Sequence, residues 1–297
     1  MIYPDNFERK IGFSEVRTLL KGRCMSSLGT EWVDHHVTFS TDFDTVRESL
    51  AQAQEFARFM ATEEDVYEEN FYDVRQPLMR IRPERTYLEE LDLFDLKRSL
   101  QTVVSLVRFL RAARDEDEDD YLAADADDAP TTSGGATPLY PALTRMTDGV
   151  SSFPQLIARI DRVLNKYGKI KDTATPELLN IRHTIEVTSR GISHSLRSII
   201  NEAQAEGYID RDVSPTLRDG RLVIPVAPAL KRKIKGIIHD ESATGKTVFI
   251  EPAAVVDANN RIRELKAAER REIIRILQIL SSEIRPHIKD ILHSMQF

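Results

Sequence analysis

Hydrophobic residues recur every three or four positions through most of the chain, a spacing that predicts amphipathic helices and a mainly α fold. The first clear helix is expected to begin with Ser14 as its N-cap. Trp32 and the scattered phenylalanines are expected to fill the core of the helical part. Further helices are predicted after Asp42 and over about 88–114, 139–148 and 153–166.

Two longer helices are predicted in the second half of the chain. One begins after Thr175-Pro176, because proline is favoured in a first helical turn, and its apolar positions continue for nearly thirty residues. At 1.5 Å per residue that helix is about 40 Å long. The other follows Pro252 and continues to the end of the chain, with a kink or interruption expected at Pro286. We expect the two helices to pair antiparallel.

The segment between these helices has a β pattern. Asp219-Gly220 lies between two β-rich runs and is the strongest short-range signal for a tight hairpin. Pro225 lacks an amide donor, which places its strand at an edge or a bulge. A small antiparallel sheet is therefore predicted, projecting tens of ångströms from the helical bundle. Its strands are expected within 213–218, 221–226, 234–239 and 246–251.

Charge is distributed unevenly along the 297 residues. The net charge is −7, but residues 115–128 hold nine acidic residues and no basic one, and without them the balance is +2. Such a segment buries too little apolar surface to fold, so 115–138 is predicted to be a disordered acidic loop. Residues 211–247 carry eight Lys or Arg against four acids. This local basic block says more about partners than the whole-chain charge does.

Composition also narrows the class of protein. The single cysteine, Cys24, excludes an internal disulfide, a cysteine zinc cage and a CxxC redox pair. Neither a secretory signal nor a membrane span is recognisable, so we expect a cytoplasmic protein without a membrane partner. We predict no metal site, because the histidines lack ligand spacing.

Two short motifs suggest chemistry that their context does not support. Gly245-Lys246-Thr247 resembles the end of a phosphate-binding P-loop, but the glycine required five residues earlier is Asp240, and a strand follows where a helix is needed. His239 and Asp240 are neighbours on a predicted strand and point to opposite faces, so they do not form a catalytic pair. We predict no catalytic and no cofactor-binding residue in this chain.

The basic cluster of the β segment is the strongest candidate site. Lys231, Arg232, Lys233 and Lys235 are suited to contact nucleic-acid phosphates through salt-dependent, sequence-independent attraction. The competing interpretation, a solvated loop, is equally compatible with composition. No aromatic platform accompanies the cluster, so stacking on single-stranded bases is not indicated.

The ordered residues of this region resemble one family. The runs Asp219–Val226 and Lys235–Pro252, then Asn259-Asn260 and the Glu-x-x-Glu-Ile pattern from Glu269, closely resemble the bacterial MutS family of the second type, the recombination-suppressing relatives of mismatch-repair MutS. The opening helix with Phe13-Ser14-Glu15-Val16 is similar too, so the resemblance spans most of the chain and is weakest around 115–138.

This resemblance implies a helical core and long antiparallel lever helices, with a small β clamp inserted at the lever tip. Residues 1–205 are the implied core and ascending lever, 207–255 the clamp and 256–297 the descending lever. The resemblance also implies an ATPase domain that binds ATP and Mg²⁺, and an Smr domain that carries nuclease activity. Neither is matched by residues here, so the chain is expected to be a non-enzymatic N-terminal fragment.

For the whole protein, the resemblance implies a homodimer that binds branched or duplex DNA through phosphates and suppresses homologous recombination. Two alternatives stay open at this point. One is a ribosome- or rRNA-binding arm of a quality-control factor of the same family, and the other is a helical scaffold that binds only protein. The candidate phosphate contacts are Lys231, Arg232, Lys233, Lys235 and Lys246, followed by Arg218 and Arg221.

Overall fold

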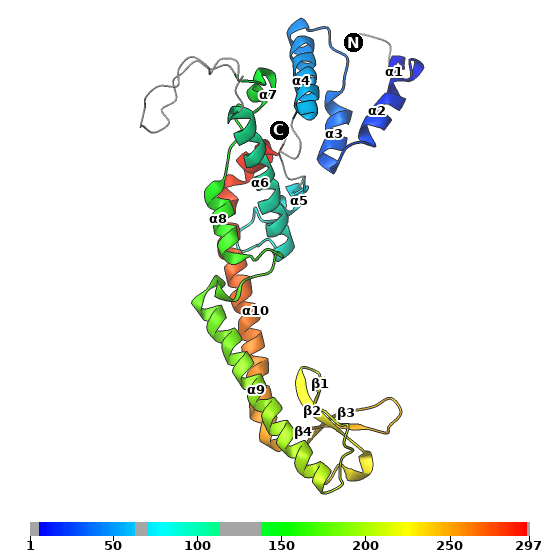
Figure 1. Ribbon diagram of the computed structural model, residues 1–297, viewed down its shortest axis with the longest axis vertical. Coiled ribbons are helices and arrows are strands. Elements are labelled where there is room, and N and C mark those ends of the chain that lie inside the picture. Colours follow the sequence, from blue (N-terminus) through cyan, green and yellow to red (C-terminus); the bar gives the residue numbers. More distant parts are fainter. Residues whose placement is uncertain (1–5, 63–70, 113–137, 296–297) are drawn as a thin grey trace. The chain divides into compact units, whose positions relative to one another are not determined.

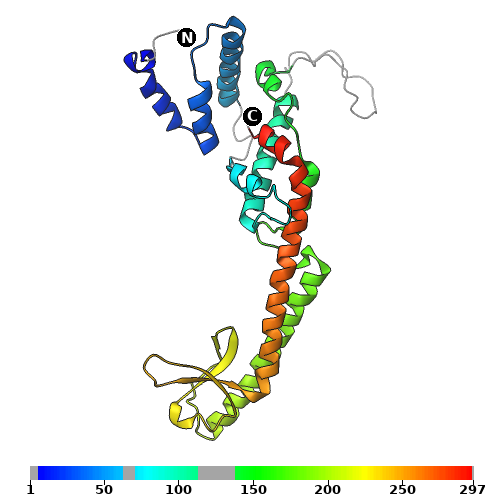
Figure 2. The ribbon, with the colours of Figure 1, turned by 180° about the vertical axis from the view of Figure 1, so that it is seen from behind.

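A computed structural model describes residues 6–62, 71–112 and 138–295 of the chain (Figures 1 and 2). The described residues form two compact units. Residues up to Lys169 together with those from Gln278 onward make the first unit, and Ile170–Leu277 make the second. The mainly helical fold with a small antiparallel sheet, predicted from the spacing of apolar residues, is confirmed.

The first unit is built from helices. Its central helix, α6 (Glu90–Ala112), buries Leu93, Leu96 and Leu100 almost completely, because these residues lie three or four positions apart on one face. The other helices of this unit are α1 (Phe7–Lys10), α2 (Phe13–Lys21), α3 (Ser27–His36), α4 (Phe43–Thr62), α5 (Arg75–Arg80), α7 (Pro141–Met146), α8 (Pro154–Val163) and α11 (Ile288–Ser294).

The start of α2 differs from the prediction. The helix begins at Phe13, and its N-cap is Gly12 with φ 77°, so Ser14 lies inside the first turn. The Ser14 carbonyl accepts a hydrogen bond from Thr18 Oγ1, one turn further on. Glycine reaches the left-handed conformation without strain, and this allows the chain to enter the helix two residues earlier than a cap at Ser14 would.

The prediction that Trp32 and the phenylalanines fill the core is wrong for the N-terminal helices. Trp32 is 48% exposed and Phe43 is 74% exposed. Among the described residues of α1–α4 only Val33 and Phe59 are buried. Helix α4 packs on α7 through the face that carries Phe59, and its opposite apolar face lies open in the described structure.

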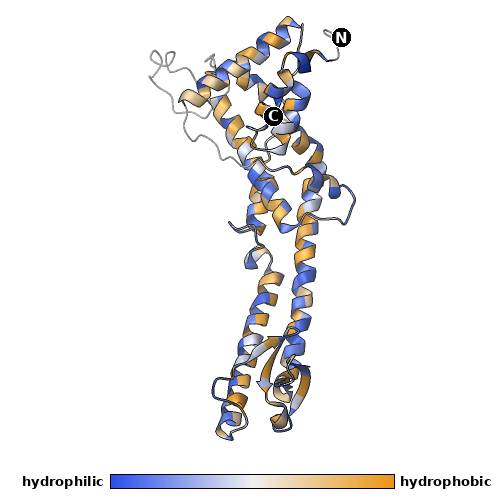
Figure 3. Ribbon diagram, turned by 90° about the vertical axis from the view of Figure 1, so that its right-hand side faces the viewer, coloured by the Kyte–Doolittle hydropathy of each residue, from blue (hydrophilic) through white to orange (hydrophobic). Residues whose placement is uncertain are grey.

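Two long helices carry the second unit. Helix α9 (Pro176–Ala205) and helix α10 (Val256–Ile284, which enters the first unit at Gln278) run antiparallel, as predicted (Figure 2). Arg182 of α9 pairs with Glu269 of α10 at 2.7 Å. Thr175 caps α9 by accepting a hydrogen bond from Leu178 N at 3.1 Å. Hydrophobic and hydrophilic residues alternate along both helices (Figure 3).

The chain after α10 follows the expectation for Pro286. The helix ends at Ile284, and a 3₁₀ turn, η5 (Arg285–His287), separates it from α11. A proline in the middle of a helix removes one hydrogen bond and clashes with the preceding turn, which explains the break. Another 3₁₀ turn, η2 (Asp172–Ala174), precedes α9.

The β segment forms one antiparallel four-stranded sheet in the order β1-β2-β4-β3. Its hydrophobic face packs on α9 and α10, where Ile224, Val248 and Ile250 meet Leu196 and Ile262 in one core. The predicted Asp219-Gly220 hairpin is confirmed, and both turn residues have positive φ values, 46° and 76°. The strands are β1 (Thr216–Arg218), β2 (Arg221–Val226), β3 (Gly236–Glu241) and β4 (Val248–Pro252).

Pro225 corrects the expectation of an edge strand. Its strand, β2, lies between β1 and β4. However, β1 pairs with β2 only as far as Val223, so the side of Pro225 that faces away from Phe249 on β4 has no strand beside it. The missing amide donor therefore costs no ladder hydrogen bond, although the strand is internal.

Some predictions fall beyond these observations. The acidic loop predicted at 115–138 lies, apart from Pro138, outside the described residues. The proposed core, clamp and lever boundaries stay a prediction. In the described parts of the chain, no helix is both long enough and apolar enough to cross a membrane.

Candidate nucleic-acid interface

The predicted cluster lies on a crossover connection. After β2, the chain passes through a 3₁₀ turn, η3 (Pro228–Leu230), and crosses to the far side of β4 before β3 begins at Gly236. Leu230 and Ile234 anchor this connection to the core shared with the helices. Because these two apolar side chains face the core, the three basic side chains between them face outward and are exposed. They are Lys231, Arg232 and Lys233.

Two members of the cluster meet the end of α9. The Lys233 ammonium lies 4.9 Å from the centre of the Tyr208 ring, a cation–π distance. Lys233 and Lys235 also line a shallow groove that includes Glu202 and Glu206 of α9. These acids offset part of the local positive charge, so Lys231 and Arg232 carry the less compensated charge of the crossover.

Lys246 lies away from the cluster. Strand β3 separates it from Lys235, and six residues of strand span about 20 Å. Ser242 and Thr247 close the β3–β4 turn through mutual hydrogen bonds, and Gly245 has φ 66° within it. The Gly-Lys-Thr triplet is thus a hairpin turn followed by a strand, as its sequence context predicted.

Arg218 and Arg221 lie at the β1–β2 hairpin and differ from each other. Arg218 is exposed and its guanidinium stacks 4.2 Å from the centre of the Phe249 ring. The Arg221 side chain is only 12% exposed and donates to Glu251 and Asn260, at 2.7 Å each. We therefore assign Arg221 to holding the hairpin in place, and its contact with phosphate stays a prediction.

A buried polar cluster positions the whole β module. Glu251 of β4 is fully buried, and its carboxylate accepts hydrogen bonds from Arg221 and from Asn259 Nδ2, both at 2.7 Å. His239 Nε2 lies 2.6 Å from the other carboxylate oxygen and donates to it, since an ionised carboxylate can only accept. Asn259, on α10, also exchanges hydrogen bonds with the backbone of Leu222. The cluster therefore joins β2, β3, β4 and α10.

Two opposing effects act on the Glu251 carboxyl. Burial raises its pKa, because the charged form loses its hydration, and the hydrogen bonds from His239, Asn259 and Arg221 lower it. The net result is a pKa below the ordinary value, so the group is ionised at neutral pH. A buried carboxylate with all these donors is a structural anchor for the surrounding cations.

The sequence interpretation overlooked this cluster. His239 was considered only with Asp240, and the structure pairs it with Glu251 across the sheet. One signal was present in the sequence: Glu251 is a charged residue in a strand whose neighbours, Val248 to Ile250, are apolar. Such a residue is buried only with partners, and the partners come from distant segments.

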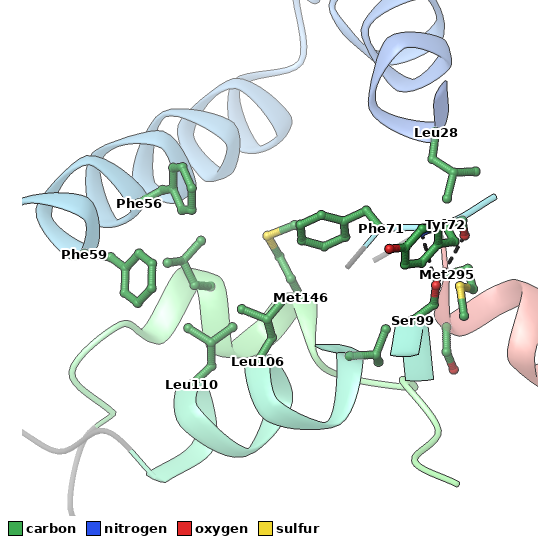
Figure 4. A pocket seen from close by; sticks show the side chains of 13 residues that line it. Leu28, Phe56, Phe59, Phe71, Tyr72, Ser99, Leu106, Leu110, Met146 and Met295 are labelled. Atoms are coloured by element: carbon green, nitrogen blue, oxygen red, sulfur yellow. Dashed lines mark hydrogen bonds between the residues drawn. The ribbon is translucent and has the colours of Figure 1, made fainter. Parts of the chain in front are cut away.

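The first unit contains an apolar cavity of ≈ 280 Å³ between α3, α4, α6 and α7 (Figure 4). Phe56, Phe71, Leu106 and Met146 are among its lining residues. Ser99 Oγ, one of its few polar groups, accepts a hydrogen bond from Tyr72 N at 3.1 Å. The cavity therefore offers contact to an apolar group and no set of residues for acid–base or nucleophilic chemistry.

Comparison with known proteins gives one consistent result. No family model matches the chain. A protein named Endonuclease MutS2 from Thermomicrobium roseum is 30% identical over 288 residues, which are 97% of this chain and 33% of the relative. The protein of the same name from Symbiobacterium thermophilum gives the same values. That of Halothermothrix orenii is 37% identical over 158 residues, 53% of this chain and 20% of the relative. The chain thus spans at most about a third of the length of these relatives.

Proposed function

This chain belongs to the MutS2 family, and on that premise we propose that its β module binds the phosphate backbone of DNA, with branched DNA as the preferred target. The observation that carries the proposal is the exposed crossover with Lys231, Arg232 and Lys233, which is fixed to the sheet by buried neighbours. Cations on a rigid support bind phosphates at a smaller cost in conformational entropy than cations on a free loop.

Binding by this surface is independent of sequence. The predicted cations are lysines and arginines, which neutralise phosphates and release counterions. The Tyr208 ring beside the crossover is covered by the Lys233 ammonium, so base stacking on it is not expected. The expected ligand is thus a duplex or a junction, whose phosphates are accessible, and the recombination-suppressing role of the full-length protein follows as part of the same proposal.

The test is binding of a fluorescent four-way DNA junction across a salt series. The variant K231E/R232E/K233E should lose affinity, and its slope of log affinity against log salt should fall by about 0.9 for each lost phosphate contact. A matched control, R23E/R82E/K166E, changes the charge equally at exposed positions of the first unit and should keep the slope. Equal slopes for both variants would refute the proposed site.

Competition identifies the class of nucleic acid. Unlabelled junction, linear DNA duplex, duplex RNA and ribosomes are added to the labelled complex at one salt concentration. Displacement by junction at lower concentration than by the others supports the proposal. Stronger displacement by duplex RNA or ribosomes would replace DNA with RNA as the ligand, since phosphate contacts alone do not separate the two.

A further inference from the structure

Helix α10 carries a row of exposed cations that the sequence interpretation did not consider. Arg263, Lys266 and Arg270 are spaced by three and four residues, so they lie on one face of the helix. All three are exposed, and within the described residues no ion pair joins them to an acid. We refer to these three residues as the α10 row.

The three glutamates next to the row are engaged elsewhere. Glu264 pairs with Arg261 at 3.2 Å, on another face of the helix. Glu269 is turned toward α9, where it pairs with Arg182 at 2.7 Å. Glu272 holds Arg275 at 2.7 Å.

Glu186 of α9 is also engaged away from the row. Glu186 pairs with Arg190 of its own helix. Since these glutamates compensate other cations, the positive charge of the α10 row is directed to solvent.

The row begins beside the β module. Arg221 of β2 donates to Asn260 Oδ1 at 2.7 Å, and Leu222 N donates to Asn259 Oδ1 at 3.2 Å, so the base of the β1–β2 hairpin rests on this turn of α10. Arg263 follows Asn260 by three residues, about 4.5 Å along the axis. The row then continues for seven residues, about 10 Å, away from the hairpin.

We propose that a nucleic-acid backbone held by the β module continues along α10 and is bound there by Arg263, Lys266 and Arg270. This inference rests on the proposed function and extends the binding surface from the crossover of the β module to the α10 row. The row is as long as about three successive phosphates of one DNA strand, measured along the duplex axis. Phosphate contacts at two separated places fix the direction in which the duplex leaves the β module.

The test compares two variants of the same helix. R263Q/K266Q/R270Q removes the row, and R261Q/R271Q/R275Q removes three positive charges from other faces of α10. Glutamine has nearly the helix propensity of lysine and arginine, and circular dichroism verifies that helicity is kept. Both variants and K231E/R232E/K233E are titrated with a 30-base-pair duplex and with a four-way junction, over the same salt series.

The expected result is a loss of about tenfold or more in affinity near 0.1 M salt for the row variant, together with a smaller salt slope. The R261Q/R271Q/R275Q variant should lose much less affinity. If both α10 variants behave alike while the crossover variant loses binding, the row is not a binding surface and the proposed function stands. If the unaltered chain shows no salt-dependent binding, both the row and the proposed function are wrong.

Discussion

Replacing Glu251 by glutamine is the sharpest test of how the β module is held together. The side chain is fully buried, and its two oxygens receive hydrogen bonds from Arg221, Asn259 and His239 at 2.6–2.7 Å. Glutamine keeps the volume and one acceptor oxygen. It removes the negative charge and introduces an amide group that must face donors.

The expected cost follows from the partners left behind. The Arg221 side chain is only 12% exposed, so its charge stays largely out of water when the carboxylate is gone. Removing one partner of a buried ion pair costs about 3–5 kcal/mol. Because glutamine retains one acceptor, we expect the lower end, about 3 kcal/mol, which is about two orders of magnitude in an equilibrium constant.

Hydrogen exchange followed by mass spectrometry measures this locally. The sole tryptophan, Trp32, lies in the other unit, so its fluorescence would not report on the sheet. Peptides from β2 to β4 should exchange about a hundredfold faster in E251Q, with peptides of α6 unchanged. The control E186Q breaks an exposed pair on α9 and should leave the sheet peptides unchanged. A change below about threefold in the sheet would refute the reasoning, since it is worth less than 1 kcal/mol.

Three further outcomes are expected. Folding lowers the pKa of Glu251, so the stability that its carboxylate adds to the fold is complete above the ordinary pKa of 4.5 and is lost as the pH falls through the lowered pKa. Thermal melting followed by circular dichroism should show this loss of stability at acid pH, and E251Q should show less of it. Gly236→Ala places a Cβ 2.1 Å from the Glu251 carbonyl oxygen, so the amides at the start of β3 should exchange their hydrogens faster. Gly191→Ala adds a methyl group with nothing within 4 Å and should stabilise α9 by about 0.5–1 kcal/mol. Thr175→Ala removes the cap of α9 and a hydrogen bond to Glu272, so the first-turn amides should lose about 1 kcal/mol of protection. Thr184→Ala, which lies beyond the first two turns and caps nothing, should leave these amides unchanged.

The predictions that were confirmed depend on local signals. Asp219-Gly220 supports the two positive φ angles of a tight turn whatever surrounds it. Thr175-Pro176 places a capping hydroxyl and a preset backbone angle at the start of α9. Pro286 breaks its helix for a covalent reason. These features need no knowledge of distant residues, which is why a single sequence was sufficient.

Predictions that needed tertiary partners were less complete. From the sequence, Arg221 and Lys231 are both candidate phosphate contacts, and only the fold pairs the first with a buried carboxylate and leaves the second exposed. The α10 row could not be predicted for the same reason, because its cations are uncompensated only when the neighbouring glutamates pair with other cations, and this pairing depends on the fold. The prediction for Trp32 was wrong in the opposite direction. An aromatic residue favours burial, but in the described structure Trp32 stacks only on His36 of its own helix and stays 48% exposed.

Binding experiments should distinguish residues that support the β module from residues that contact phosphates. Cations that touch phosphates set the slope of log affinity against log salt, because each contact releases counterions. Glu251 touches no phosphate in this scheme, and it only holds the hairpin against α10. E251Q should therefore weaken junction binding without changing the slope, whereas the crossover and row variants should reduce the slope itself. If E251Q reduced the slope as strongly as they do, the cations would be positioned only through the buried cluster, and the division between supporting and contacting residues would be wrong.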